Sequence, residues 1–141
     1  MRLILGFLAL FVFLSLPAQA EDLSAQDKSA FQAIISDQIA AFQADDGAKA
    51  YGFASPGIQS MFPNPLLFMD MVKRGYQPVY RPQSFTFGES GINPAGRPFQ
   101  KVTIIGPDGL TYEALYSMER QPDGSWKISG CALVRAPDVS T

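Results

Sequence analysis

The sequence lacks histidine entirely and has a single cysteine, Cys131, among its 141 residues. Without histidine the chain cannot use Ser-His-Asp or Cys-His catalysis, and it loses the commonest ligand of zinc sites. A single cysteine cannot form an internal disulfide. Any catalysis by this chain would therefore depend on carboxylates, tyrosines, lysines or the Cys131 thiol.

Blocks of like charge are absent as well, although the chain carries 11 basic and 13 acidic residues. This pattern disfavours nucleic acids and anionic membrane surfaces as partners. The sequence also contains no internal repeat and no low-complexity segment, and nothing in it indicates a cofactor.

Only one long hydrophobic run is present, from Leu3 to Leu16, and it follows the basic Arg2. A run of 14 residues is shorter than the roughly 20 needed to span a bilayer as a helix. It is followed by Ala18-Gln19-Ala20, the small-x-small pattern that a signal peptidase accepts. We therefore predict a signal peptide over residues 1–20, cleaved after Ala20, and an exported protein in the periplasm or the medium. An uncleaved anchor is the alternative.

The remaining residues, 21–141, suit a single domain, with an ordered core over about residues 24–135. A chain of this size can bury about two thirds of its unfolded surface without disulfides. After cleavage we expect no stable membrane anchor.

The first half of this domain has a helical period. Ser24 and Asp27 form a capping pair before "SAFQAIISDQIAAF". One helical face then carries apolar residues and a single glutamine: Phe31, Ile34, Ile35, Gln38, Ile39 and Phe42. The pattern predicts an amphipathic helix.

Three further helix starts are predicted. Asp46 is predicted to be the N-cap residue of a short second helix, because an aspartate side chain can accept hydrogen bonds from backbone N–H groups. Ser55-Pro56 and Asn64-Pro65 each place a capping residue before a proline at the first helical position.

The helix that starts at Asn64 should turn three residues inward: Phe68, Met71 and Val72. We expect it to end with Gly75 in the left-handed conformation, and Pro78 to prevent it from resuming. Helix termination does not account for Tyr80 and Arg81, so these two residues become candidates for a site.

After residue 82 the period of the hydrophobic pattern changes to two. We predict strands at 84–89, 99–106, 110–120 and 126–134, with a loop at 90–98 and turns at 107–109 and 121–125. Short turns join antiparallel neighbours. Helices followed by such a meander predict an α+β domain, with the helices packed on one face of a curved antiparallel sheet of three to four strands.

The segments "DQIAAFQADDGAKAYGFASPGIQ", "FMDMVKRGYQPVYRP" and "ALYSMERQPDGSWKISGCAL" resemble Domain of Unknown Function 4864, a family of exported bacterial proteins. This resemblance implies no activity and no catalytic residues. The order of helices and strands is more distantly similar to the cone-shaped fold of nuclear transport factor 2 and ketosteroid isomerase. That similarity implies a fold only, because such folds host many functions.

Six residues are the candidates for a ligand site: Gln38, Asp45, Tyr80, Arg81, Tyr112 and Tyr116. Gln38 interrupts the apolar helix face, and the tyrosines could line an apolar cavity with a few polar groups. Each has a structural alternative: a backbone hydrogen bond for Gln38, a helix end for Asp45, and an aromatic core for the tyrosines. We interpret Cys131 as a small buried thiol, and Asp45-Asp46 as a cap and not a metal site.

Three classes of function stay open. The first is a non-catalytic module that binds a small apolar ligand in a tyrosine-lined cone. The second is an isomerase-like or dehydratase-like enzyme without histidine, using Asp37 or Asp45 as a buried base. The third is a cell-envelope interaction module that uses the exposed face of its sheet to form a homodimer or to bind a partner protein. The first is favoured, because every polar residue also has a structural explanation.

Overall fold

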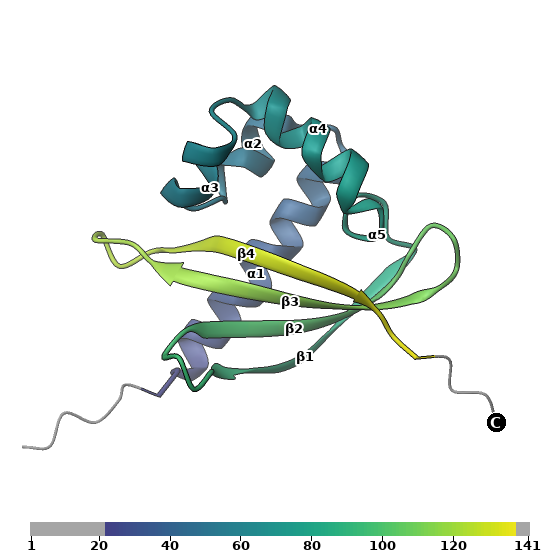
Figure 1. Ribbon diagram of the computed structural model, residues 1–141. Helices are drawn as coiled ribbons and strands as arrows, with labels where there is room; N and C mark the ends of the chain where they lie inside the picture. The colour runs from purple at the N-terminus through teal and green to yellow at the C-terminus, as the bar shows by residue number, and fades with distance from the viewer. Residues whose placement is uncertain (1–21, 138–141) are drawn as a thin grey trace, which may run out of the picture.

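The computed structural model describes residues 22–137, which form five helices and one four-stranded antiparallel sheet (Figure 1). The helices come first: α1 (Ala25–Gln43), α2 (Gly47–Gly52), α3 (Pro56–Met61), α4 (Pro65–Gly75) and α5 (Gln77–Tyr80). The strands follow in the spatial order β1 (Ser84–Ile92), β2 (Pro98–Ile105), β3 (Thr111–Arg120) and β4 (Trp126–Arg135). The predicted α+β class is confirmed. The predicted signal peptide, residues 1–20, lies outside the described residues.

Each of the first four helices begins at the capping residue that the sequence predicts. The Asp27 N–H donates to the Ser24 hydroxyl at 3.0 Å, and the Ser24 N–H donates to the Asp27 carboxylate at 3.1 Å. Asp46, Ser55 and Asn64 cap α2, α3 and α4 with their side-chain oxygens. These bonds satisfy N–H groups that a helix start leaves without partners, so the local sequence fixes where the helices begin.

The end of α1 is formed by a residue in the left-handed region, Asp45, with φ of 51°. The Asp45 N–H donates to the Phe42 carbonyl at 3.0 Å, and the Asp46 N–H donates to the Ala41 carbonyl at 2.8 Å. This pair of bonds is usually built around a glycine, but aspartate enters the left-handed region more readily than most residues. The structural interpretation of Asp45 as a helix end is confirmed.

Two predictions about the segment after α4 were wrong. Gly75 is the last residue of α4 and is not among the described residues with positive φ. Pro78 does not prevent a new helix, because it lies in the first turn of α5, where its missing N–H costs no helical hydrogen bond. The end of the first strand also differs from the prediction, because β1 continues to Ile92 and does not stop at Glu89.

The ladder between β1 and β2 is interrupted between Phe87 and Ser90. The fully buried Gln100 of β2 lies across from the interruption. Its side-chain Nε2 donates to the Gly88 carbonyl at 3.0 Å and to the Lys101 carbonyl at 2.9 Å. The glutamine amide thus replaces bonds that the irregular ladder cannot make.

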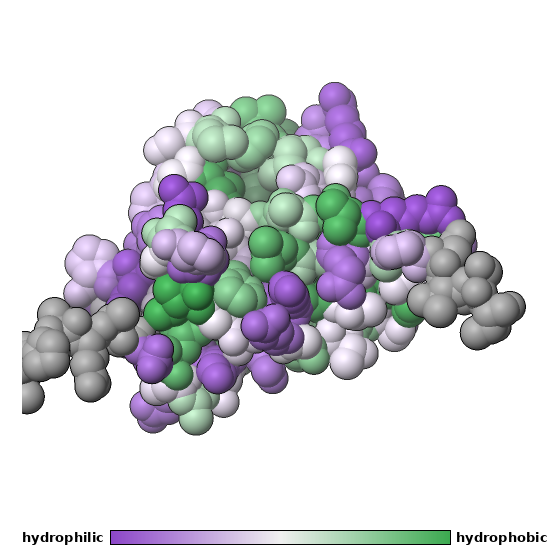
Figure 2. Space-filling view, turned by 60° about the horizontal axis from the view of Figure 1, so that its bottom comes forward, coloured by the Kyte–Doolittle hydropathy of each residue, from purple (hydrophilic) through white to green (hydrophobic). Residues whose placement is uncertain are grey.

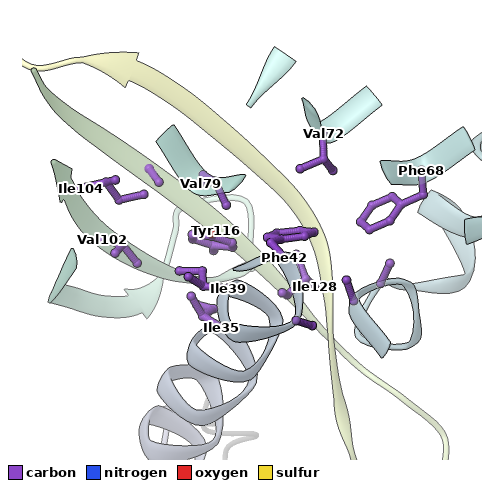
Figure 3. Close-up of a cluster of buried hydrophobic side chains, with 14 of the residues drawn as sticks. Ile35, Ile39, Phe42, Phe68, Val72, Val79, Val102, Ile104, Tyr116 and Ile128 are labelled. Carbon is purple, nitrogen blue, oxygen red and sulfur yellow. The ribbon is translucent and has the colours of Figure 1, made fainter. Parts of the chain in front are cut away.

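The core lies between the sheet and the helices. In Figure 1, α1 crosses the rear face of the sheet, and α2 to α4 lie on the β4 side. Helix α5 lies at one end of the sheet, where it contacts β2 and the chain enters β1. The largest fully buried apolar and aromatic side chains come from α1 and the two central strands: Phe31, Ile35, Ile39, Phe42, Val102, Ile104 and Tyr116. Figure 3 shows Phe42 beside Tyr116, with Val72 and Phe68 of α4 on the helical side of them.

The inward face of α4 differs in one residue from the prediction. Phe68 and Val72 are buried as expected, but Met69 is buried with them, and Met71 is only partly buried against the core. None of the helices within residues 22–137 is long and apolar enough to cross a membrane.

The connection between α2 and α3 is attached to the outer edge of β4. The Ser55 N–H donates to the Ile128 carbonyl at 2.8 Å, and the Ile128 N–H donates to the Phe53 carbonyl at 2.9 Å, which makes a parallel bridge at Ala54. This bridge holds the short helix α3 beside the edge strand.

Candidate functional site

A cavity of about 370 Å³ lies between the helices and β4, within the range of 300 to 1,000 Å³ that is usual for small-molecule sites. We call it the helix–strand cavity. Most of its lining is apolar, and it includes Phe42, Ala54, Ile58, Met61, Phe62, Phe68, Met71, Val72, Val79 and Ile128. Figure 2 shows hydrophobic surface around the recess between the helices and the sheet. Met61 is 71% exposed, so it lies at the opening of the cavity.

The polar part of the lining consists of uncharged groups only: Gln38, Tyr76, Tyr116, Ser129 and Cys131, with Gly130 between the last two. No Asp, Glu, Lys or Arg of the described chain belongs to the lining. The cavity is therefore an apolar environment with a few neutral hydrogen-bonding groups.

Gln38 lines the cavity from α1 and is buried. Its Nε2 donates to the Ala50 carbonyl at 3.1 Å, which links α1 to α2. The structural interpretation of Gln38 as a residue with a buried backbone hydrogen bond is thus confirmed, and the same residue reaches the cavity.

Tyr116 lines the cavity from the centre of β3, and its side chain is 1% exposed. Its hydroxyl has no hydrogen-bond partner among the described residues. The Cys131 thiol lies across from it on β4, close enough for each group to influence the pKa of the other, but the hydroxyl makes no hydrogen bond of ordinary geometry with the thiol. Burial raises the pKa of the Tyr116 phenol well above 10, so it stays protonated and can donate a hydrogen bond.

Cys131 was expected to be buried, but the residue is only partly buried, at the wall of the cavity. Burial raises the pKa of its thiol to about 12, and the neighbouring Tyr116 hydroxyl opposes this effect only in part. A thiol with such a pKa is neutral near pH 7 and is a poor nucleophile.

Asp45, Tyr80 and Arg81 come together, but outside the lining of the cavity. We call these three residues the α1-end cluster. The Tyr80 hydroxyl donates to Asp45 Oδ1, and Arg81 Nη2 donates to Asp45 Oδ2 at 2.9 Å. Arg81 Nη1 donates to the Phe42 carbonyl, and its guanidinium lies over the Tyr80 ring at 3.9 Å from the centroid. The cluster thus closes the end of α1, which is a structural role.

The predicted meeting of Tyr80 and Arg81 with the strand tyrosines in one site is therefore not found. Tyr112 also lies outside the cavity lining, and its hydroxyl donates to Asp108 Oδ2 at 2.6 Å in the turn before β3. That hydrogen bond raises the pKa of Tyr112 and lowers the pKa of Asp108. Among the six candidates, the structure brings Gln38 and Tyr116 to the cavity and places the other four elsewhere.

The proposed catalytic carboxylates do not meet the condition set for them. Asp37 and Asp45 are both exposed, whereas a general base of the predicted kind must be buried in a cavity. The hydrogen bond from Tyr80 and the charge of Arg81 lower the pKa of Asp45, which is opposite to the shift that such a base needs.

Tyr76 was not among the six candidate residues, although it is one of the tyrosines that could line a cavity. It lines the cavity from the end of α4. Met61, Ser129 and Gly130 carry no sequence pattern that predicts their positions, because they depend on how α3 packs against β4.

Within residues 22–137, no group of three or more Cys, Asp or Glu residues is placed to hold a metal ion.

Comparison with known proteins identifies the family. The sequence profile described as Domain of unknown function (DUF4864) matches residues 24–141, so the chain belongs to this family. No curated protein and no solved structure matched the chain significantly, and the similarity to the nuclear transport factor 2 cone stays a prediction.

Proposed function

We propose that this member of the Domain of unknown function 4864 family is a non-catalytic binding protein that holds a small, largely apolar ligand in the helix–strand cavity. The observation that carries the proposal is the cavity itself, about 370 Å³ in volume, with an apolar lining and no charged side chain from the described residues. Sites for small molecules are usually concave and mostly apolar, with a few polar groups that orient the ligand.

The size of the cavity limits the ligand. At the packing density of protein interiors, about 0.74, a cavity of this volume holds on the order of 15 non-hydrogen atoms. Since burial of apolar surface contributes about 25 cal/mol per Å², a ligand of this size can bind without any ion pair.

The binding test uses N-phenylnaphthylamine, a neutral dye of suitable size whose fluorescence rises in apolar surroundings. We expect one molecule to bind per chain and to raise the melting temperature. Val72 is buried and lines the cavity. Val72→Phe should therefore abolish binding, because the larger phenylalanine side chain would occupy the space of the ligand. Leu66→Phe on the same helix is the matched control, since Leu66 is 80% exposed and is absent from the lining.

Cys131→Leu provides a second way to fill the cavity, from β4, in case Val72→Phe does not fold. Equal dye binding by the wild type and by both filled variants, each folded by circular dichroism, would refute the proposed site. No binding by the wild type would refute it as well.

We also propose that the protein is exported and cleaved after Ala20, on the basis of the apolar run at Leu3–Leu16 and the small residues at Ala18 and Ala20. Mass spectrometry of the natural protein should find an N-terminus at Glu21. An intact Met1 or Arg2 in the mature protein would contradict this proposal.

A further inference from the structure

The further inference rests on the proposed function and concerns the chemical class of the ligand. We infer that the ligand is uncharged and carries one hydrogen-bond acceptor, such as a ketone or an ester carbonyl, which receives a hydrogen bond from the Tyr116 hydroxyl.

The first step of the argument is the state of the Tyr116 hydroxyl. It is a buried polar group with no partner among the described residues and with almost no accessible surface, and the residue that carries it lines the cavity, so a ligand oxygen reaches the hydroxyl only when a neighbouring side chain of the lining shifts. A buried hydroxyl without a hydrogen bond destabilises the folded state, because the group has lost its hydrogen bonds to water and gained none in return. A ligand acceptor that reaches this hydroxyl removes this destabilisation, whereas an alkane leaves it in place.

The second step concerns the direction of the bond. The phenol keeps its proton because burial opposes its ionisation, so it can offer a donor to a ligand at any ordinary pH. The Cys131 thiol, across from it, is neutral for the same reason and adds no charge. Ligand groups that only accept hydrogen bonds therefore fit this wall.

The third step is the absence of compensation for a charged ligand group. The lining holds no Lys or Arg to pair with a carboxylate and no Asp or Glu to pair with an amine, among the residues described. The guanidinium of Arg81 is already engaged by Asp45 and by the Phe42 carbonyl. A charge buried without a partner carries a desolvation cost of several kcal/mol, so charged ligands bind less well.

Helix ends act in the same direction against anions. Phe42 lies in the last turn of α1 and Tyr76 at the C-cap of α4, and both line the cavity. The C-terminal end of a helix carries partial negative charge, which repels a carboxylate.

The test compares ligands of one chain length by displacement of N-phenylnaphthylamine: methyl nonyl ketone, undecane, undecanoate and undecylamine. We expect the ketone to bind most tightly. Tyr116→Phe should weaken ketone binding by about five- to tenfold, the value of one hydrogen bond, and leave undecane unchanged. Tyr112→Phe is the matched control, because its hydroxyl is bonded to Asp108 away from the cavity and its loss should change no affinity in the series.

The possible failures are distinguishable. If the dye does not bind, the proposed function is refuted, and this inference falls with it. If the dye binds but the ketone is no better than undecane, or Tyr116→Phe weakens both equally, only the inference is overturned. Tightest binding by undecanoate or undecylamine, or no displacement by any of the four compounds, overturns the inference in the same way.

Discussion

Replacing Tyr116 by phenylalanine should make the ligand-free protein more stable. The substitution removes one buried oxygen that has no hydrogen-bond partner within residues 22–137 and keeps the aromatic ring in the core (Figure 3). Most Tyr→Phe substitutions in protein cores destabilise, because they break a hydrogen bond. The sign expected here is therefore unusual, and it follows only from the absence of a partner.

The magnitude is the difference between two terms. Burying a hydroxyl without a partner costs about 1 to 3 kcal/mol, and Tyr116→Phe recovers that cost. The space of one missing oxygen atom, roughly 20 Å³, costs about 0.5 kcal/mol at 24 cal/mol per Å³ of cavity. We expect a net gain of about 1 kcal/mol, which for a domain of this size raises the melting temperature by about 4 °C.

The assay is thermal and urea unfolding followed by the fluorescence of Trp126, the only tryptophan. Its ring packs edge-to-face on Phe31 of α1, with centroids 4.8 Å apart, so its emission reports on the contact between α1 and the sheet. The protein should first be unfolded in guanidinium, extracted with solvent and refolded, so that no co-purified ligand occupies the cavity. Tyr112→Phe is the control, because it removes a hydroxyl that does have a partner.

A clear result in either direction is informative. If Tyr116→Phe lowers the stability of stripped protein by 1 kcal/mol or more, the hydroxyl has a partner, such as a buried water, and the reasoning is wrong. If the proposed ligand is present, the order reverses: protein with bound ketone should be more stable with Tyr116 than with phenylalanine, since binding stabilises the folded state.

Two other residues give predictions that can be measured alongside. Arg81→Ala should lower the free energy of unfolding by about 1 kcal/mol at pH 7 without changing dye affinity, because it removes the charged hydrogen bond to the Phe42 carbonyl. Since the folded-state pKa of Asp45 lies below its usual 3.8, the stabilisation from this carboxylate is complete above about pH 4 and is lost as the pH falls further. Acid unfolding curves should show a smaller loss in Arg81→Ala, and identical curves would contradict the role of the pair. Cys131, with a pKa of about 12, should react with maleimide at pH 8 on the order of a thousand times more slowly than in the unfolded chain, and a fast reaction would contradict the raised pKa of its thiol.

The helix starts and the class of the fold could be predicted because they depend on neighbouring residues. Ser24, Asp46, Ser55 and Asn64 each cap the helix that the sequence assigns to them. The ends of the helices could not be predicted in the same way. A residue in the left-handed conformation was expected at Gly75, at the end of α4, but it is found at Asp45, at the end of α1. Its bonds to Tyr80 and Arg81 lie 35 and 36 residues away in sequence, and no local pattern contains them.

The candidate site was predicted only in part for a similar reason. Gln38 and Tyr116 were found because each is a polar residue on an otherwise apolar face, which is a signal that the sequence carries. Tyr80 and Arg81 gave the same kind of signal, an aromatic and a cation without an obvious structural use. The structural role of these two residues depends on the contact between α5 and the end of α1. The atoms that Arg81 binds, the Phe42 carbonyl and Asp45 Oδ2, lie far earlier in the chain.

The way in which α3 is held explains why a cavity persists beside β4. This helix has no fully buried residue of its own, and only Ile58 packs partly against the core, so apolar packing draws it only weakly toward the strand. Hydrogen bonds hold it instead: the Tyr51 hydroxyl donates to the Phe62 carbonyl at 2.7 Å, and Gln59 Nε2 donates to the Tyr51 carbonyl at 3.1 Å. At its start, Ser55 is bonded to Ile128. A wall fixed by directional bonds keeps the cavity formed before a ligand arrives, and a pre-formed site loses less conformational entropy on binding than one that must open. The apolar surface that α3 leaves uncovered is thus available to the ligand.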